Sequence, residues 1–246
     1  MKVYYGFDNL PQLHNAVATM GSYDGVHSGH RELLQQVVSL AKQHQTQSVV
    51  LTFSPHPRYV LGNGENLRLL NTLEEKIHLI EEQGIDYLIV VPFTEEFSQK
   101  RPLEFIQENI LAVGITTLVV GYNHRFGHNK EGDFNFLESK AEGLNIHLID
   151  QHFVQQSKVS STVIRQMINK GMMQKAAQLL AGPYLIKAEI NNQGEVVNID
   201  DKKLLPPAGK YSIEVSGEMT TLTIDENRKI RLERGFESVE FIKFVE

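Results

Sequence analysis

The apolar residues of the first 150 positions follow two alternating patterns. Short runs that are apolar throughout predict buried strands at residues 17–21, 48–53, 86–92, 117–121 and 145–149. Between them, apolar residues at helical spacing predict helices at residues 30–44, 73–83, 102–112 and 134–143. Strands that are apolar throughout are covered on both faces, so this alternation predicts a doubly wound, mostly parallel α/β sheet.

The pattern changes after Gly182 and Pro183. Two short helices are predicted just before that point, at residues 162–170 and 174–180, with Gly171 between them. Beyond it, strand-forming stretches alternate with turn signals, at residues 184–190, 195–200, 210–215, 220–225, 229–233 and 238–245. We therefore expect two domains, an α/β domain over residues 1–183 and a small β-barrel-like domain over residues 184–246.

Composition narrows the class of protein. Hydrophobic residues make up 41% of the chain and charged residues 22%, as in ordinary globular proteins. No apolar run approaches the roughly 20 residues that span a bilayer, and the N-terminal segment lacks the basic and apolar parts of a signal peptide. Because the chain has no cysteine, disulfides, thiolate nucleophiles and cysteine-held metals are excluded. These features predict a cytoplasmic protein that does not enter a membrane.

The formal net charge of −6 bears on what the protein binds. Proteins that bind nucleic acid generally need a basic surface to neutralise the phosphates, and this composition argues against one. Any phosphate group is therefore expected to bind at a local site. This favours small phosphorylated molecules as ligands and argues against nucleic acid.

The segment Gly21-Ser-Tyr-Asp-Gly-Val-His-Ser-Gly-His30 joins the first predicted strand to the first predicted helix. Its small residues let the backbone approach a ligand closely, and the exposed N–H groups of a helix N-terminus attract phosphate. His27 and His30 could donate hydrogen bonds to an anion whose charge grows during a reaction. A zinc pair or surface histidines are the alternatives, but no third zinc ligand stands at an obvious spacing.

Two further loops follow predicted strands, at residues 53–58 (FSPHPR) and 121–127 (GYNHRFG). In parallel sheets, ligands gather at the carboxyl ends of the strands, where these loops and the first one can converge. The prolines of the first of these segments, Pro55 and Pro57, fix an extended path with few free N–H groups. Alone, the first segment would be no more than a loop terminator, and a glycine-bounded turn is the structural alternative for the second.

A fourth segment, Val159-Ser-Ser-Thr-Val-Ile-Arg165, opens the next predicted helix. Ser160 or Ser161 can cap this helix, which is a purely structural role. Hydroxyl groups at a helix start, with Arg165 one turn later, can also hold a polyphosphate. Both roles are open at this point.

Together, the four segments resemble those of bacterial FAD synthetases. The first contains H-x-G-H, the signature of the nucleotidyltransferase superfamily, and its longer form is similar to the family pattern GNFDGVHLGH. The others resemble the family's F-x-P-H-P, G-x-[DN]-F-x-F-G and V-S-S-T-x-I-R segments, and the resemblance extends from residue 17 to about residue 184. The chain departs from the family pattern at Ser22, Tyr23 and His124.

The resemblance implies a Rossmann-like nucleotidyltransferase domain that transfers AMP from ATP to FMN, giving FAD and pyrophosphate, with Mg²⁺ as cofactor. It implies catalytic roles for His27, His30 and Asn123. The residues expected to bind ATP and its phosphates are Gly21, Ser22, Tyr23, Asp24, Gly25, Gly29, Ser160, Ser161, Thr162 and Arg165. Those expected to contact the flavin are Pro55, Pro57, Phe105 and Phe126. No residue is assigned as a protein ligand of the metal.

The C-terminal region departs further from the family. Full-length bacterial members continue with a riboflavin kinase barrel marked by G-x-P-T-A-N, and this segment is missing here. Residues 205–211 (LPPAGKY) do resemble a strand entry of that barrel. We therefore expect a shortened kinase-like barrel without riboflavin kinase activity.

Two other functions stay open. H-x-G-H alone permits an enzyme that adenylylates or cytidylylates another phosphorylated small molecule, although the segments at residues 55–57 and 121–127 argue against it. A flavin or nucleotide sensor without catalysis is the other possibility, supported only by Ser22, His124 and the shortened C-terminal region. The sequence predicts neither the oligomeric state nor the preferred redox state of the flavin.

Overall fold

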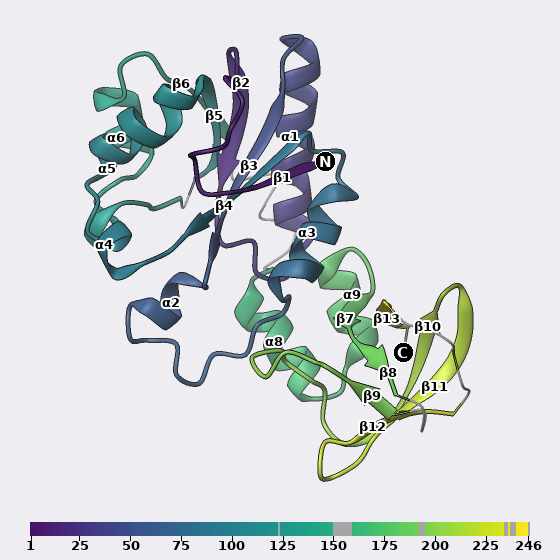
Figure 1. Cartoon of the computed structure of the whole chain (residues 1–246). Coiled ribbons are helices and arrows are strands. Elements are labelled where there is room, and N and C mark those ends of the chain that lie inside the picture. The colour runs from purple at the N-terminus through teal and green to yellow at the C-terminus, as the bar shows by residue number, and fades with distance from the viewer. Residues whose placement is uncertain (123, 150–158, 192–194, 234–235, 237–239, 246) are drawn as a thin grey trace. The chain divides into compact units, whose positions relative to one another are not determined.

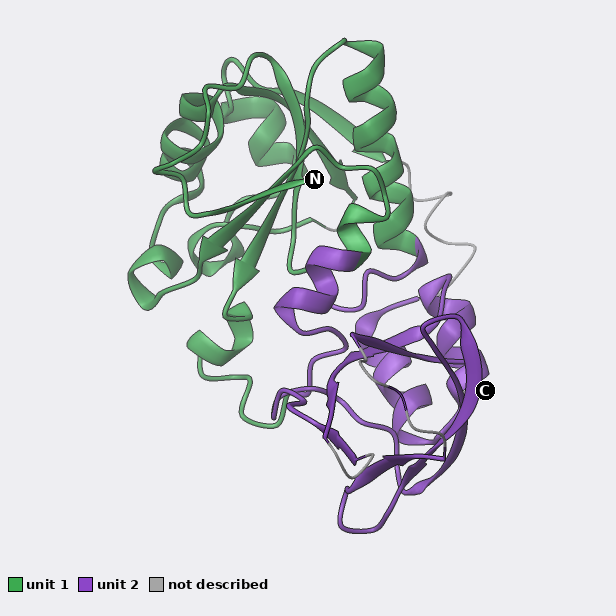
Figure 2. Ribbon diagram, turned by 45° about the vertical axis from the view of Figure 1, so that its right-hand side comes forward, with its two compact units in different colours: residues 1–23, 29–67, 79–158 green, residues 24–28, 68–78, 159–246 purple. Residues whose placement is uncertain are grey.

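The computed structural model describes the 246-residue chain except residues 123, 150–158, 192–194, 234–235, 237–239 and 246. Figure 1 shows its helices and strands, and Figure 2 shows that they form two compact units. Unit 1 consists of residues 1–23, 29–67 and 79–158. Unit 2 consists of residues 24–28, 68–78 and 159–246. The domain boundary expected at residue 183 stays a prediction.

A six-stranded sheet forms the centre of unit 1. Its strands are β1 (Lys2–Tyr5), β2 (Ala16–Met20), β3 (Ser48–Ser54), β4 (Tyr87–Pro92), β5 (Ile115–Gly121) and β6 (Asn145–Ile149). They lie in the order β1-β4-β3-β2-β5-β6, and every pairing is parallel. The predicted doubly wound parallel sheet is therefore confirmed. β1 was not predicted, because it is an edge strand without a fully buried side chain.

The helices between these strands are α1 (Ser28–Gln43), α2 (Pro57–Val60), α3 (Leu73–Glu81), α4 (Glu95–Ser98), α5 (Pro102–Phe105) and α6 (Phe134–Lys140). Figure 1 shows α1 on one side of the sheet and α5 and α6 on the other. Ala18 and Met20 of β2 share one buried core with Phe105 of α5. All five residues of β2 are buried, as expected for a strand between two layers of helices.

The helix predicted at residues 102–112 changes its winding. α5 continues as a π-helical segment, Ile106–Ile110, and then as a 3₁₀ turn, Leu111–Val113. Ile106 and Ile110 are fully buried, so the apolar pattern predicted a helix without indicating the change. The segment ends at Gly114, whose φ of +88° suits glycine and where a Cβ atom would lie 1.9 Å from the backbone oxygen of Leu13.

A curled antiparallel sheet forms most of unit 2. Its strands are β7 (Tyr184–Lys187), β8 (Glu189–Ile190), β9 (Glu195–Val197), β10 (Gly209–Val215), β11 (Glu218–Ile224), β12 (Ile230–Leu232) and β13 (Phe241–Phe244). Their order is β7-β13-β10-β11-β12-β9-β8. β7 and β8 lie at opposite ends of this order although only Ala188 separates them in sequence, so the sheet curls back on itself. The expected β-barrel-like module is confirmed, although residues 238 and 239 of its last predicted strand lie outside the described residues.

Two helices complete unit 2, α8 (Ser161–Asn169) and α9 (Met173–Leu180). Ile164 and Ile168 of α8 and Ala176 of α9 belong to the same buried core as Ile213 and Phe244 of the sheet. One core therefore joins these helices to the C-terminal strands. None of the described helices is long and apolar enough to cross a membrane, and the cytoplasmic location stays a prediction.

Candidate functional site

Three of the candidate loops begin at one edge of the unit 1 sheet. β3, β2 and β5 are neighbours and run parallel, and they lead into the loops at residues 53–58, 21–30 and 121–127. Within the sheet, β3 and β4 lie on one side of β2, and the next strand along the chain, β5, lies on its other side. Ligands of open α/β sheets bind where the strand order reverses in this way. The prediction that these loops start at the same edge of the sheet is confirmed.

The loop after β2 has an unusual backbone. Tyr23, Gly25 and Val26 have φ angles of +48°, +99° and +40°. Residues with a Cβ atom rarely adopt such angles, and they do so where the surrounding structure holds them in place. Glycine is required at position 25, since a Cβ atom there would lie 2.8 Å from Leu70 Cδ1. The surrounding structure therefore holds this loop in one tightly folded backbone conformation before α1.

Tyr23 supports the second histidine of the motif. Its side chain is 1% exposed, and its hydroxyl donates to Thr19 Oγ1 over 2.9 Å. Its ring packs edge-on with that of His30, with centroids 5.2 Å apart and planes at 67°. Burial raises the pKa of the Tyr23 hydroxyl, so it stays protonated as a donor. The side chain thus holds His30 in place, and the expected contact of Tyr23 with ATP stays a prediction.

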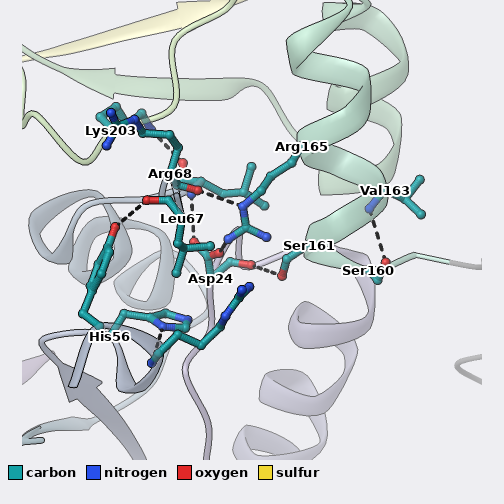
Figure 3. Close-up of polar contacts among 12 residues, drawn as sticks. Asp24, His56, Leu67, Arg68, Ser160, Ser161, Val163, Arg165 and Lys203 are labelled. Carbon is teal, nitrogen blue, oxygen red and sulfur yellow. Dashed lines mark hydrogen bonds and ion pairs between the residues drawn. The ribbon is translucent and has the colours of Figure 1, made fainter. Parts of the chain in front are cut away.

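Asp24 lies at the centre of the polar contacts of unit 2 (Figure 3). Its side chain is 4% exposed. Oδ1 accepts from the Leu70 N–H over 2.8 Å, and Oδ2 pairs with Nη2 of Arg165. The backbone oxygen of Asp24 accepts from Ser161 Oγ over 2.7 Å. Because a carboxylate repels phosphate and both its oxygens are engaged, Asp24 is better suited to holding Arg165 than to binding ATP directly.

Arg165 is held by two contacts within unit 2. Nε donates to the backbone oxygen of Arg68 over 2.8 Å, and Nη2 pairs with Asp24. A guanidinium has five N–H donors in one plane, so the two contacts fix the plane and use two of the donors. As far as the described residues go, three donors are left for a ligand. The side chain is 17% exposed, which keeps it within reach of solvent.

The start of α8 supplies the hydroxyl groups of the fourth segment. Ser160 is the N-cap, and its Oγ accepts from the Val163 N–H over 3.3 Å. The capping prediction is thereby confirmed for Ser160, whereas the Ser161 hydroxyl donates to the backbone of Asp24. Thr162 is exposed. The positive end of the helix dipole lies here, where an anion is favoured.

His27 is half-buried in the loop before α1. Burial lowers the pKa of its imidazole to about 4, although the Asp24 carboxylate opposes this shift. The ring is therefore neutral at pH 7 and has one N–H to donate. Gly29 and His30 follow in the first turn of α1. Asn123, the third expected catalytic residue, lies outside the described residues.

The aromatic residues expected to contact the flavin lie in unit 1 within a row of rings. Neighbouring centroids are 5.6 to 6.4 Å apart along the set Phe53, Phe93, Phe97, Phe105, Phe126 and Phe136. Phe105 is 4% exposed and belongs to the core, while Phe126 is half-buried. The row therefore joins the end of β3 to the loop after β5, and Phe126 is the more open of its two predicted flavin contacts.

Pro55 and Pro57 follow a different path from the extended one that was expected. Pro55 is exposed, and Pro57 is the first residue of α2. His56 caps this helix, because its Nδ1 accepts from the Arg58 N–H over 3.2 Å. Proline is favoured at the first helical position, where its missing N–H would have no helical partner. The prediction of an extended path is wrong from Pro57 onward.

His124 stands where the family pattern has a phenylalanine. Its ring stacks on Phe126, with centroids 5.7 Å apart and planes at 25°. Among the described residues, its shielded Nε2 has no hydrogen-bond partner. Burial lowers the pKa of the imidazole to about 4. His124 is therefore a neutral ring in aromatic surroundings, which explains how it replaces a phenylalanine.

The buried His124 ring predicts a loss of stability in acid. Its pKa is about 4 in the folded chain and 6.5 when unperturbed, so between these values the unfolded state binds a proton that the folded state does not. The free energy of unfolding should therefore fall as the pH drops through this range. One pKa unit corresponds to about 1.4 kcal/mol, which gives roughly 2 kcal/mol at pH 5. His124→Phe should remove this pH-dependent part of the free energy of unfolding, as measured by urea unfolding at pH 7.5 and pH 5.

The exposed His147 provides the control for this experiment, since its ring meets water in both states. His147→Gln should leave the difference between the two pH values unchanged. If the free energy of unfolding changed equally with pH in His124→Phe and in the original chain, the neutral state of His124 in the folded chain would be contradicted.

Two backbone groups at the site were not predicted from sequence. The backbone oxygen of Arg68 holds Arg165, and the backbone N–H of Leu70 holds Asp24. Because every residue type has these groups, no sequence signal could have revealed them.

Lys76, a buried lysine near Asp24, was also not predicted from the sequence. It lies in unit 2 and is 5% exposed. Burial lowers the pKa of its ammonium to about 8, while the Asp24 carboxylate opposes the shift. In the same region, Thr72 and Glu75 form a capping box at the start of α3, with hydrogen bonds of 2.9 and 3.3 Å. Among the described residues, no group of three histidine or acidic side chains could hold a metal ion.

The fold as a whole recurs in a solved structure. A crystal structure described as a macrolide-efflux protein from Streptococcus pneumoniae matches with a TM-score of 0.82, covering 98% of this chain and 96% of that one. Its sequence is 20% identical, so this likeness shows the fold alone.

Sequence comparisons identify the family. The chain is 32% identical over 218 residues to a bifunctional riboflavin kinase/FMN adenylyltransferase of Listeria monocytogenes, covering 83% of this chain and 69% of the relative. It is 31% identical over 220 residues to an FAD synthetase of the same organism, covering 88% of this chain and 87% of the relative. The family described as FAD synthetase matches residues 10–163, more than half of the chain. The chain therefore belongs to the FAD synthetase family.

Proposed function

We propose that the chain is an FMN adenylyltransferase, which transfers the AMP part of ATP to FMN and yields FAD and pyrophosphate. The observation that carries the proposal is the guanidinium of Arg165, which Asp24 and a backbone oxygen hold while, among the described residues, three of its N–H donors have no partner. Such a fixed, partly open guanidinium suits the charged oxygens of a polyphosphate. The match to the FAD synthetase family supports the same reaction.

In this reaction a phosphate oxygen of FMN attacks the α-phosphorus of ATP. A new O–P bond forms there, while the bond from the α-phosphorus to the oxygen bridging to the β-phosphate breaks. The electron pair of that bond leaves with pyrophosphate. The FMN phosphate is already an anion, so no side chain has to remove a proton. Catalysis then depends on alignment and on donors for the negative charge that grows at the α-phosphate.

We assign these donors to His27 and His30. A neutral His27, as its lowered pKa requires, donates one N–H without a change in its charge. Asn123 is proposed to help position the phosphates, and Arg165 with Thr162 to hold the leaving pyrophosphate. The remaining ATP contacts proposed are Gly21, Ser22, Gly25, Gly29, Ser160 and Ser161. The proposed flavin contacts are Pro55, Pro57, Phe105 and Phe126.

Magnesium enters this proposal with the substrate. Mg²⁺ prefers oxygen ligands, keeps several waters, and is commonly bound through substrate phosphates and one or two carboxylates. The described residues offer no cluster of three acidic or histidine ligands, and Asp24 is already paired with Arg165. These residues therefore fit MgATP as a substrate better than a metal ion held by the protein beforehand.

We further propose that the chain does not phosphorylate riboflavin. The kinase segment G-x-P-T-A-N is missing from its sequence. This observation supports adenylyl transfer as the single activity of the chain.

Two incubations with Mg²⁺ and ATP test the proposal, one with FMN and one with riboflavin, with the flavins separated by HPLC. FAD and pyrophosphate are expected from FMN, and no phosphorylated product is expected from riboflavin. Formation of FMN from riboflavin would show that the kinase activity is present after all.

Further incubations with phosphopantetheine and nicotinamide mononucleotide test the choice of substrate. Adenylylation of either molecule in preference to FMN would assign the chain to another transfer reaction. Binding of FMN and ATP in a calorimeter, without release of pyrophosphate, would favour a sensor over an enzyme.

A further inference from the structure

Lys203, in the loop before β10, is a buried lysine that the proposed reaction does not use. Its side chain has no exposed surface. The ammonium donates to the backbone oxygens of Leu70 and Leu185 over 2.7 and 2.5 Å, and to Glu75 Oε2 over 2.5 Å. An ammonium group has three N–H donors, so all of them are used. It also lies 4.2 Å from the centre of the Tyr184 ring, a favourable position for a cation.

Glu75 is buried as completely as Lys203. Its Oε2 also accepts from the Thr72 N–H over 2.9 Å, and its Oε1 accepts from the N–H of Lys187 in β7 over 2.7 Å. A buried ion pair is tolerated when such additional hydrogen bonds offset the cost of removing both charges from water. Within unit 2, the pair therefore ties the start of α3 to the C-terminal strands.

Leu69 forms an isolated parallel β-bridge with Lys203. Its N–H donates to the backbone oxygen of Lys202 over 2.7 Å, and its own oxygen accepts from the Leu204 N–H over 2.9 Å. The bridge does not use the oxygen of Arg68 or the N–H of Leu70, the backbone groups on either side of Leu69.

These two backbone groups hold the two charged residues of the candidate phosphate site (Figure 3). The Arg68 oxygen accepts from Arg165 Nε, and the Leu70 N–H donates to Asp24 Oδ1, each over 2.8 Å. Leu70 is thus bonded to Asp24 through its N–H and to Lys203 through its oxygen. A single residue connects the buried lysine to the phosphate site.

We propose that Lys203 is a positioning residue for ATP binding, which holds the backbone of Leu70 so that Asp24 and Arg165 keep their arrangement. The inference rests on the proposed adenylyl transfer. It assigns a function to the β module, which supports the phosphate site of the proposed transferase. Lys203 touches no substrate in this role.

Lys203→Met tests the inference in the full chain, since methionine fills much of the same space without the charge. Calorimetric titrations with FMN and with an ATP analogue that cannot transfer its AMP group give two dissociation constants. The constant for the ATP analogue should rise about tenfold or more, while that for FMN should change less than about twofold. A merely structural role would lower the fraction of protein that binds either ligand and leave both constants unchanged.

Lys243→Met is the matched control, because Lys243 lies in β13 of the same sheet in a half-exposed pair with Glu214. It should leave both constants unchanged. If Lys203→Met does not fold, combining it with Glu75→Gln removes both charges together, and the glutamine keeps an acceptor for the Thr72 N–H. The same difference between the ATP analogue and FMN is expected of this double variant.

Hydrogen exchange at the Leu69 and Leu70 amides gives a readout that needs no ligand. Exchange should become at least about tenfold faster in Lys203→Met and stay the same in Lys243→Met. Unchanged binding of the ATP analogue by Lys203→Met would overturn the inference, whatever the exchange rates are. If the original chain itself did not bind the ATP analogue, the proposed function would be wrong, and the inference with it.

Discussion

Replacing both His27 and His30 by alanine is expected to abolish the formation of FAD. In the proposed reaction the two rings supply the donors for charge at the α-phosphate. Removing one donor of this kind typically lowers kcat by roughly 10² to 10³. The kcat of the double variant should therefore fall by a factor of at least about 10³. The measurement is the steady-state release of pyrophosphate with saturating ATP and FMN.

The double variant should still fold, because neither histidine belongs to the buried face of α1. That face consists of Leu34, Val37, Val38 and Ala41. Loss of the ring contact between Tyr23 and His30 should cost about 1 kcal/mol in the free energy of unfolding. His44→Ala is the control, since His44 is an exposed histidine just beyond the end of α1, and it should keep full activity. Unchanged turnover in the double variant would rule out the assignment of the two histidines.

The unit 1 sheet could be predicted from sequence because its interior strands are apolar on both faces. All five residues of β2 are buried, and four consecutive residues of β4 are buried as well. β1 carries no such run, so it gave no signal. The helices α2 and α4 have four residues each, which is too short for apolar positions to repeat at helical spacing.

The side chains of the candidate phosphate site could be named from sequence, but what holds them could not. Asp24 and Arg165 stand out by residue type and motif. Their partners include the backbone of Arg68 and Leu70, which any residue would provide. The motif alone therefore assigns Asp24 to the phosphates, whereas Leu70 and Arg165 engage its carboxylate.

The support of the site from the β module was equally hidden. Lys203 and Glu75 are 128 positions apart, and both residue types are usually exposed. The Thr72-x-x-Glu75 spacing is typical of a capping box at the start of α3, which accounts for only one contact of the Glu75 carboxylate. The remaining contacts depend on long-range packing, about which local periodicity carries no information.

Breaking the Asp24–Arg165 pair is expected to cause the largest loss of stability among substitutions at the candidate site. The two side chains are 4% and 17% exposed, so removing one leaves the other charge largely buried. Losses of this kind reach roughly 3 to 5 kcal/mol, and we expect about 3 kcal/mol for Arg165→Met. Asp24→Asn should cost less, because the asparagine oxygen can still accept from the Leu70 N–H. Urea unfolding at pH 7 measures both values.

A double-mutant cycle shows whether the two charges hold each other. The double variant carries neither charge. Its free energy of unfolding should therefore fall by about 2 kcal/mol less than the sum of the two single losses. The exposed pair of Lys210 and Glu233 is the control, and Lys210→Met with Glu233→Gln should show a coupling below about 1 kcal/mol. Strictly additive losses for Asp24 and Arg165 would contradict the coupling.

The same variants separate the binding of phosphate by Arg165 from the positioning of Arg165 by Asp24. Arg165→Met removes the donors, so the dissociation constant of the ATP analogue should rise by roughly 10 to 100-fold. Asp24→Asn keeps the guanidinium but releases one of its two contacts, so binding should weaken by about tenfold. Electrostatic repulsion alone predicts the opposite sign, because removing a carboxylate near a phosphate strengthens binding. Tighter binding of the ATP analogue by Asp24→Asn would therefore show that Asp24 does not position Arg165 for ATP.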